Sequence, residues 1–136
     1  MENQQKASKV LNINLWVAQV LLALVLTWAS AMKLFQPVGK VAAMWPWAGQ
    51  VPVALLKFTG IVDLLGALGL VLPALLRIKP ILTPLAAIAI IVLMVCASVF
   101  HIVRDEASVI GVNVFFTGIA AFIAWGRFKK APISEK

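Results

Sequence analysis

The chain has 136 residues, of which 62% are hydrophobic and 12% charged, and its mean hydropathy is +1.01. That proportion of apolar residues exceeds what the interior of a soluble domain of this length can hide, so the composition excludes an ordinary soluble protein and indicates an integral membrane protein. The formal net charge of +7 lies in residues that flank apolar runs. We therefore expect contact with membrane lipids that have anionic head groups, and no binding of nucleic acid.

Four apolar runs are long enough to cross a membrane, because a spanning helix needs about 20 residues. Short polar breaks separate the later runs, as the connections of an antiparallel bundle require. The pattern predicts an all-α integral membrane protein, an antiparallel four-helix bundle that forms one domain over residues 1–136. The predicted spans are 13–34, 53–76, 81–103 and 107–125.

The first run also resembles a signal peptide. Lys6 and Lys9 precede it, and Ala29-Ser30-Ala31 looks like a cleavage site for a signal peptidase. The apolar stretch is longer than the usual h-region of about 7 to 15 residues, however. We therefore expect a helix that is retained in the mature protein.

The connection between the first two spans is the longest and carries Trp45-Pro46-Trp47. Paired tryptophans are typical of the interface between lipid and water. We expect an interfacial segment that lies on the membrane or dips into it as a cap over the bundle. An ordered loop held by aromatic anchors is favoured over a substrate lid.

The basic residues divide unequally between the two sides of a chain that crosses four times. The side of the termini receives eight of them, and the other side receives four: Lys6, Lys9, Arg77, Lys79, Arg127, Lys129, Lys130 and Lys136 against Lys33, Lys40, Lys57 and Arg104. The positive-inside rule therefore predicts that both termini are cytoplasmic. We expect the membrane to be a plasma membrane of the bacterial inner-membrane type.

Asp63 is a carboxylate in an almost purely apolar run, about 15 Å below the outer boundary on an ideal helix. Such a residue costs about 2.5 to 3.5 kcal/mol on insertion scales, so it should face the protein interior and a partner. Lys33, at the outer end of the first span, is the natural counter-charge. It can also snorkel to the surface. The difference in depth, about 15 Å, favours a neutral or water-bridged carboxyl group over a direct ion pair.

Other polar residues lie in the same outer half of the membrane. His101 is close to the outer end of the third span, Asn113 is about 9 Å inside the fourth, and Arg104 and Glu106 belong to the outer turn between them. Each polar residue in a span shares its helix face with small residues, which is typical of a bundle interior. The pattern predicts an outward-opening polar pocket. Its candidate ligand-binding or proton-relay residues are Asp63, His101, Asn113, Lys33, Glu106, Arg104 and, in the inner half, Gln19.

Residues for other chemistry are scarce. A single histidine beside loop carboxylates gives little support for a metal site, and Cys96 is the only cysteine, so we expect no metal and no intrachain disulfide. No serine or cysteine stands in a recognisable nucleophile motif, and no haem, flavin or iron–sulfur ligand set is visible. We assign no catalytic residue and do not expect a stand-alone enzyme.

Several short motifs follow one another in a characteristic order and spacing. They are Ala31-Met32-Lys33-Leu34, Gly60 to Leu70 around Asp63, Phe100-His101 with Arg104 and Glu106, then Asn113 and Ala124-Trp125-Gly126-Arg127. Together they resemble the DoxX-like family of small four-helix membrane proteins, over nearly the whole chain. Family members more often have glutamate at the position of Asp63, and the shorter side chain reduces its reach toward Lys33 or a ligand.

The resemblance implies three hypotheses. Some members are similar to the small subunit of a thiosulfate:quinone oxidoreductase or are linked to membrane redox complexes, which favours a membrane subunit or accessory protein of a quinone-linked complex. In that role Asp63, His101 and Asn113 would hydrogen-bond a bound quinone and pass protons outward, and a partner redox subunit would be needed. The alternatives are a non-catalytic lipid-binding or membrane-protein assembly factor, as in distant animal relatives, and a small proton-coupled transporter that would form a homo-oligomer.

Overall fold

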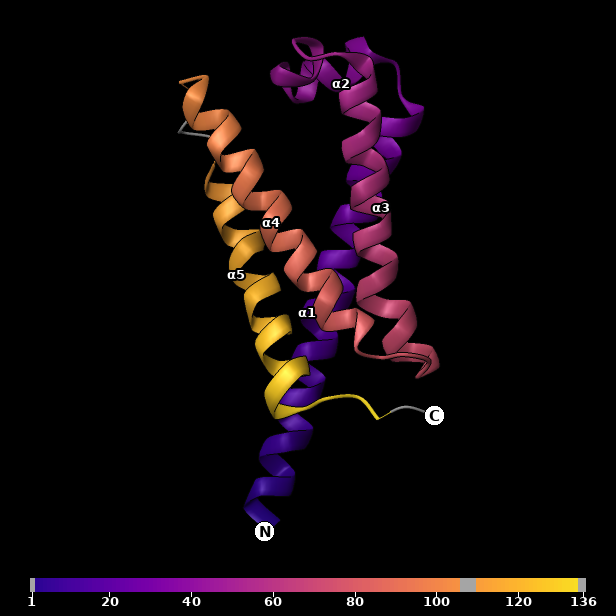
Figure 1. Cartoon of the computed structure of the whole chain (residues 1–136), viewed down its shortest axis with the longest axis vertical. Coiled ribbons are helices and arrows are strands. Elements are labelled where there is room, and N and C mark those ends of the chain that lie inside the picture. Colours follow the sequence, from indigo (N-terminus) through magenta and orange to yellow (C-terminus); the bar gives the residue numbers. More distant parts are fainter. Residues whose placement is uncertain (1, 106–109, 135–136) are drawn as a thin grey trace.

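The computed structural model describes residues 2–105 and 110–134, and within them every regular element is a helix (Figure 1). The elements are α1 (Glu2–Phe35), α2 (Val38–Met44), the 3-10 helix η1 (Pro46–Gly49), α3 (Val53–Leu76), α4 (Leu82–Val103), α5 (Gly111–Trp125) and the π-helical turn η3 (Gly126–Lys130). Four stretches are long and apolar enough to cross a membrane: Lys9–Phe35, Val53–Leu76, Leu82–Val103 and Gly111–Lys130. The protein is therefore an all-α membrane bundle, as the composition predicts.

Two helices differ in length from the apolar runs that predict them. α1 begins at Glu2, well before the apolar run, because its polar N-terminal residues are good helix formers. In Figure 1 this end of α1 extends past the other helices. α5 begins at Gly111, and its helical path continues through η3 to Lys130. The predicted start of this span, Ala107, lies outside the described residues.

The spanning helices run alternately up and down, and both ends of the chain lie at one end of the bundle (Figure 1). We call this the terminal end, and the opposite end, which carries α2 and η1, the cap end. α1 packs mainly on α3, and α4 packs on both α5 and α3, whereas α1 and α5 meet over a shorter length. Toward the cap end the α4–α5 pair leans away from the α1–α3 pair (Figure 1).

Glycines allow the helices to approach closely in the half of the bundle near the terminal end. A Cβ atom built on Gly69 would lie 2.7 Å from the Cβ of Ala86, and one on Gly126 would lie 2.5 Å from a terminal methyl carbon of Leu15. Small residues at helix contacts are how membrane helices gain close packing without a hydrophobic driving force between them. These contacts join α3 to α4 and α1 to the start of η3.

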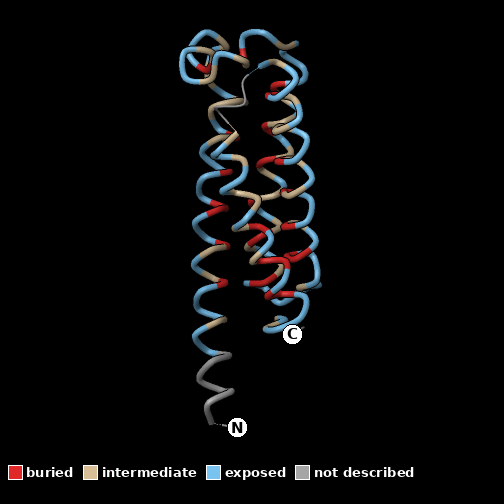
Figure 2. The backbone as a smooth tube through the Cα atoms, turned by 90° about the vertical axis from the view of Figure 1, so that its left-hand side faces the viewer, coloured by how far each residue is buried: buried red, intermediate tan, exposed pale blue. Residues whose placement is uncertain are grey.

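The interior of the bundle is an apolar core that all four spanning helices share. Its buried members are Leu22, Ala23, Leu26, Ala67, Leu70, Ala87, Ile90, Met94, Ala120, Ile123 and Ala124. Figure 2 shows buried residues along the inward sides of the helices and exposed ones on the outward sides. Those outward sides carry large apolar residues such as Leu21, Leu65 and Leu75. A surface of this kind is suited to contact with lipid chains.

The predicted interfacial segment is α2 with η1, and it forms a small core of its own. Val41, Ala48 and Leu56 are buried there, with Trp45 and Trp47 packed against them. The indole rings of the segment contact aromatic side chains of two spanning helices. Trp45 meets Trp28 of α1 edge to face at 5.6 Å between ring centroids, and Trp47 meets Phe100 of α4 at 6.1 Å. The cap therefore reaches from the α1–α3 pair to α4.

Candidate functional site

A cavity of about 710 Å³ lies near the cap end, among the four spanning helices. This volume falls within the range of about 300 to 1,000 Å³ that is usual for small-molecule sites. The lining residues are Val25, Leu26, Ala29 and Lys33 of α1; Met44, Trp45, Pro46 and Trp47 of the cap; Thr59 and Asp63 of α3; Leu93, Met94, Ala97 and His101 of α4; and Gly111, Val112, Asn113 and Phe116 of α5. Four of the seven residues singled out from the sequence thus share one cavity: Lys33, Asp63, His101 and Asn113.

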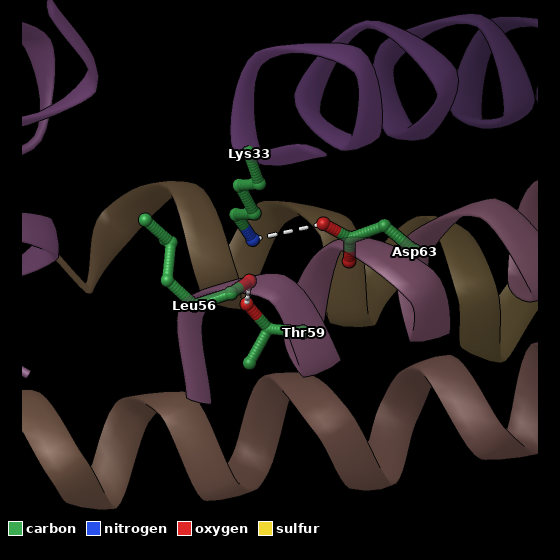
Figure 3. Close-up of polar contacts among 4 residues, drawn as sticks. All are labelled: Lys33, Leu56, Thr59 and Asp63. Carbon is green, nitrogen blue, oxygen red and sulfur yellow. Dashed lines mark hydrogen bonds and ion pairs between the residues drawn. The ribbon is translucent and has the colours of Figure 1, made fainter. Parts of the chain in front are cut away.

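Lys33 and Asp63 form a direct ion pair at the cavity wall. The Nζ of Lys33 donates to Oδ2 of Asp63 at 2.8 Å (Figure 3), and the two side chains are only 13% and 3% exposed. The expectation that the difference in depth prevents direct contact is therefore wrong, and the contact needs no water bridge. A Cβ atom on Gly60 would lie 3.0 Å from the Cβ of Lys33. Lys33 is thus level with the turn of α3 just before Asp63, because α1 ends beside the third turn of α3 rather than beside its first.

Lys57 explains how the end of α1 is held at that level. Its Nζ donates to the backbone carbonyl of Leu34 at 2.6 Å. The last carbonyls of a helix have no partner within the helix, and they carry the negative end of the helix dipole. An ammonium group at this position satisfies one carbonyl and fixes the register between α1 and α3, and thereby the reach of Lys33 to Asp63.

Two indoles complete the surroundings of the Lys33 ammonium. Its Nζ lies 5.8 Å from the ring centroid of Trp45 and 5.6 Å from that of Trp47, within the range of cation–π attraction. The sequence predicts these tryptophans only as membrane anchors, and their place in the cavity was missed. A signal was present, since Trp45 and Trp47 belong to the connection after the first span and therefore lie on the same side of the membrane as the outer residue Lys33.

His101 and Asn113 line the cavity from α4 and α5, whereas the ion pair comes from α1 and α3. His101 is 7% exposed, and its ring meets that of Trp47 edge to face at 6.1 Å. Asn113 is partly exposed. Thr59 also lines the cavity, and its hydroxyl donates to the carbonyl of Leu56 at 2.8 Å (Figure 3). The cavity therefore combines an ammonium, a carboxylate, an imidazole, an amide and a hydroxyl group.

Of the remaining three predicted residues, Arg104 and Gln19 do not line this cavity. Arg104 donates to the side-chain oxygen of Gln50 and lies 5.2 Å from the ring centroid of Phe100. Glu106 lies outside the described residues. Gln19 is fully buried in the terminal half, where its amide nitrogen donates to the carbonyl of Leu70 at 2.7 Å. Gln19 thus belongs to a different polar cluster.

That second cluster is built around Arg127, which is 3% exposed. Its Nε donates to Gln19 at 2.7 Å, and its Nη1 donates to the side chain of Asn12 and to the carbonyl of Ala131, each at 2.8 Å. The guanidinium group also lies 5.7 Å from the ring centroid of Trp16. The sequence predicts Arg127 only as a flanking charge. Asn12, Trp16 and Gln19, spaced on one helix face, were the available signal for a buried partner.

Groups that could hold a metal ion are scarce in the described chain. Across residues 2–105 and 110–134, no three histidine, cysteine, aspartate or glutamate residues come together. Cys96 is a free thiol on the exposed side of α4. The chemistry that the cavity residues themselves offer is hydrogen bonding, charge neutralisation and proton exchange.

Comparison with known protein families finds a match to the DoxX-like family. The model of the DoxX-like family covers residues 17–123, a stretch that contains every residue lining the cavity. Comparison with curated proteins and with solved structures finds no match.

Proposed function

The chain belongs to the DoxX-like family, and on that premise we propose that it is a small membrane subunit, or accessory protein, of a quinone-linked redox complex in a bacterial inner membrane. The observation that carries the proposal is the cavity at the cap end. Its walls are largely apolar, and a small set of polar groups, among them the paired Lys33 and Asp63, lines it. Few convergent polar groups in an apolar pocket are typical of a site for an amphipathic small molecule.

A quinone head group fits the chemistry of these residues. Its two carbonyl oxygens accept hydrogen bonds, and the cavity supplies donors in the ammonium of Lys33, the imidazole of His101 and the amide of Asn113. Trp45 and Trp47 offer aromatic surface beside the ammonium. The ion pair has no net charge, which suits an uncharged head group, because a charged ligand would have to compete with one partner of the pair.

The division of labour follows from the residues available. Interconversion of a quinone and its quinol moves two electrons and two protons. Asp63 and His101 would exchange the protons with the outer side, and a partner redox subunit would exchange the electrons. The unequal distribution of basic residues supports an orientation with the cap end outside and both termini in the cytoplasm.

The test is which lipids copurify with the protein. We expect protein extracted from its native membrane to carry a quinone or another isoprenoid lipid, and Asp63→Ala and His101→Ala to lose it. Mass spectrometry of the extracted lipids measures this. Cys96→Ala is the matched control, because Cys96 is exposed on the same helix as His101. Equal lipid content in the wild type and both cavity variants would contradict a ligand in this cavity.

A lipid-binding or assembly role is the second candidate. The observation that favours it is that, in the described chain, no cluster of three histidine, cysteine, aspartate or glutamate residues could hold a redox metal. The same experiment separates the two roles. A quinone in the extract, together with copurified redox proteins, supports the complex subunit, whereas a phospholipid with no redox partner supports the assembly factor.

A further inference from the structure

We propose that the cavity has a lateral portal between α1 and α5 near the cap end, through which a quinone with a long isoprenoid chain enters from the membrane. In this arrangement the ring lies toward Lys33 and Asp63, and the chain leaves between the two helices into the lipid. The inference rests on the proposed function. It adds the route by which the quinone enters and a role for its isoprenoid chain in that entry.

The first observation is where α1 and α5 are held together. Close packing occurs toward the terminal end, where Gly126 lies against Leu15 and the neighbouring Arg127 bonds to Gln19. α1 otherwise packs mainly on α3, and the α4–α5 pair leans away from it toward the cap end (Figure 1). The cavity occupies the part of the bundle where these two pairs diverge.

The second observation is that exposed residues on the facing flanks also line the cavity. Val25 of α1 and Val112 of α5 both do so, although they are 37% and 59% exposed. A residue that contributes to a cavity and also to the outer surface lies at the rim of an opening. These two valines therefore mark an opening of the cavity on either side of the α1–α5 boundary.

Helix geometry places both rim residues on the correct flank. Leu34 faces α3, since a Cβ atom built on Gly60 would lie 3.1 Å from the Cγ of Leu34. Val25 precedes Leu34 by nine residues and Lys33, which also lies against Gly60, by eight, so it lies about 80° to 180° around α1 from the side that packs on α3. Val112 precedes Gly126 by 14 residues, or about four turns, so it shares the flank with which α5 meets α1. The opening thus lies between α1 and α5.

The third observation is the gradient of polarity along the cavity. Lys33 and His101 lie toward the cap, whereas Leu26 and Leu93 line the cavity seven and eight residues earlier on α1 and α4, about 10 to 12 Å farther from the cap end. Val25 is eight residues before Lys33, about 12 Å farther from the cap end. An amphipathic molecule that entered at this depth would bring its chain out level with the hydrocarbon and keep its ring among the polar groups.

The cap lies across part of the alternative route from water, although Met44, which also lines the cavity, is 43% exposed. Trp45 packs against Trp28, and Trp47 packs against Phe100, so the two indoles join the cap to helices on both sides of the cavity. A soluble ligand would have to pass these aromatic contacts, whereas the valine rim faces lipid. The geometry therefore favours ligands that are already dissolved in the membrane.

The experiment compares entry rates for two probes that share a ring. Menaquinone-4 and menadione are both naphthoquinones, and only the first has an isoprenoid chain. Protein in lipid nanodiscs is mixed with vesicles that contain menaquinone-4, or with menadione in solution. Saturable quenching of tryptophan fluorescence reports binding, because Trp45 and Trp47 line the cavity.

Val112→Phe is the portal variant, and Val114→Phe is its matched control, because Val114 is 60% exposed on the same helix and does not line the cavity. We expect Val112→Phe to slow quenching by menaquinone-4 roughly tenfold. The control should match the wild type, and the rate for menadione should change less than about twofold. Gly111→Phe, with Gly118→Phe as its control, is a second pair, since a Cβ atom on either glycine meets nothing within 4 Å.

Two failures are distinguishable. If both probes quench saturably but Val112→Phe and Gly111→Phe behave like their controls, the portal is refuted and the quinone site stands. If neither probe quenches the wild type saturably, the quinone site is refuted and the portal falls with it.

Discussion

At the scale of single residues, Lys33 does two things at once. It neutralises the carboxylate of Asp63, and it holds a positive charge beside the faces of Trp45 and Trp47. Removal of one partner from a buried ion pair leaves an uncompensated charge, whereas replacement of both by apolar residues removes the charges together. The stability of the cavity wall should therefore depend on the pair rather than on either residue alone.

We expect Asp63→Ala to lower the free energy of unfolding by about 3 to 5 kcal/mol, because it leaves the Lys33 ammonium unpaired. The double variant Lys33→Met with Asp63→Leu should recover most of that loss, and Asp63→Glu should retain the pair. Denaturation in mild detergent measures the free energy of unfolding of all three variants. The single variants Lys33→Met and Asp63→Leu complete a double-mutant cycle with the double variant. Additive effects of the single substitutions would show that the two groups are not coupled.

At the scale of helices, the packing near the terminal end depends on glycines that differ in what surrounds them. The space beside Gly69 is limited by the Cβ of Ala86, which has no rotamer to change, whereas Gly126 faces the flexible end of Leu15. Gly118 faces open space. The loss of stability caused by an added methyl group should therefore be largest at Gly69, smaller at Gly126 and smallest at Gly118.

We expect Gly69→Ala to destabilise the protein most, by about 1 to 3 kcal/mol, because α3 and α4 must separate. Gly126→Ala should cost less, since Leu15 can adjust. Gly118→Ala should be neutral or stabilising by up to about 1 kcal/mol, through helix propensity. Thermal unfolding in the same detergent ranks the three. Equal losses at Gly69 and Gly118 would be incompatible with the close contact between α3 and α4.

At the scale of the whole molecule, the class of fold follows from composition and apolar run length, because a lipid environment permits few alternatives to a helical bundle. Helix phase and depth also bring Lys33, Asp63 and His101 to one side of the membrane, where the structure has its cavity. The depth argument misses the ion pair, because it assumes that neighbouring spans begin and end at the same level. In the structure the end of α1 lies farther along α3, where Lys57 bonds to the carbonyl of Leu34. Arg127 was missed because a basic residue after an apolar run usually lies in water. Whether the cavity binds a ligand stays a prediction.

The orientation of the whole bundle is testable with reporter fusions. We expect a cytoplasmic reporter to be active when fused after the C-terminal residue and within 77–80, and a reporter that is active only outside the cytoplasm to work when inserted within residues 36–52. The physical reason is that eight of the twelve basic residues lie on the side of the termini. An external C-terminus would reverse the orientation and place the cavity in the cytoplasmic half of the membrane.

The tight contact of Gly126 with Leu15 has a mechanical consequence, since the contact between Gly69 and Ala86 lies in the same half of the bundle. Together these contacts form a fulcrum, that is, a closely packed region about which the α1–α3 pair can rotate relative to the α4–α5 pair. Lys33 is 18 residues from Leu15, a lever arm of about 27 Å, so a rotation of about 5° at the fulcrum moves the far end of α1 by roughly 2 Å. The arm on the other side of the fulcrum is the start of α1, which extends past the bundle (Figure 1). A force on that extension would change the separation of the helices at the opposite face of the membrane.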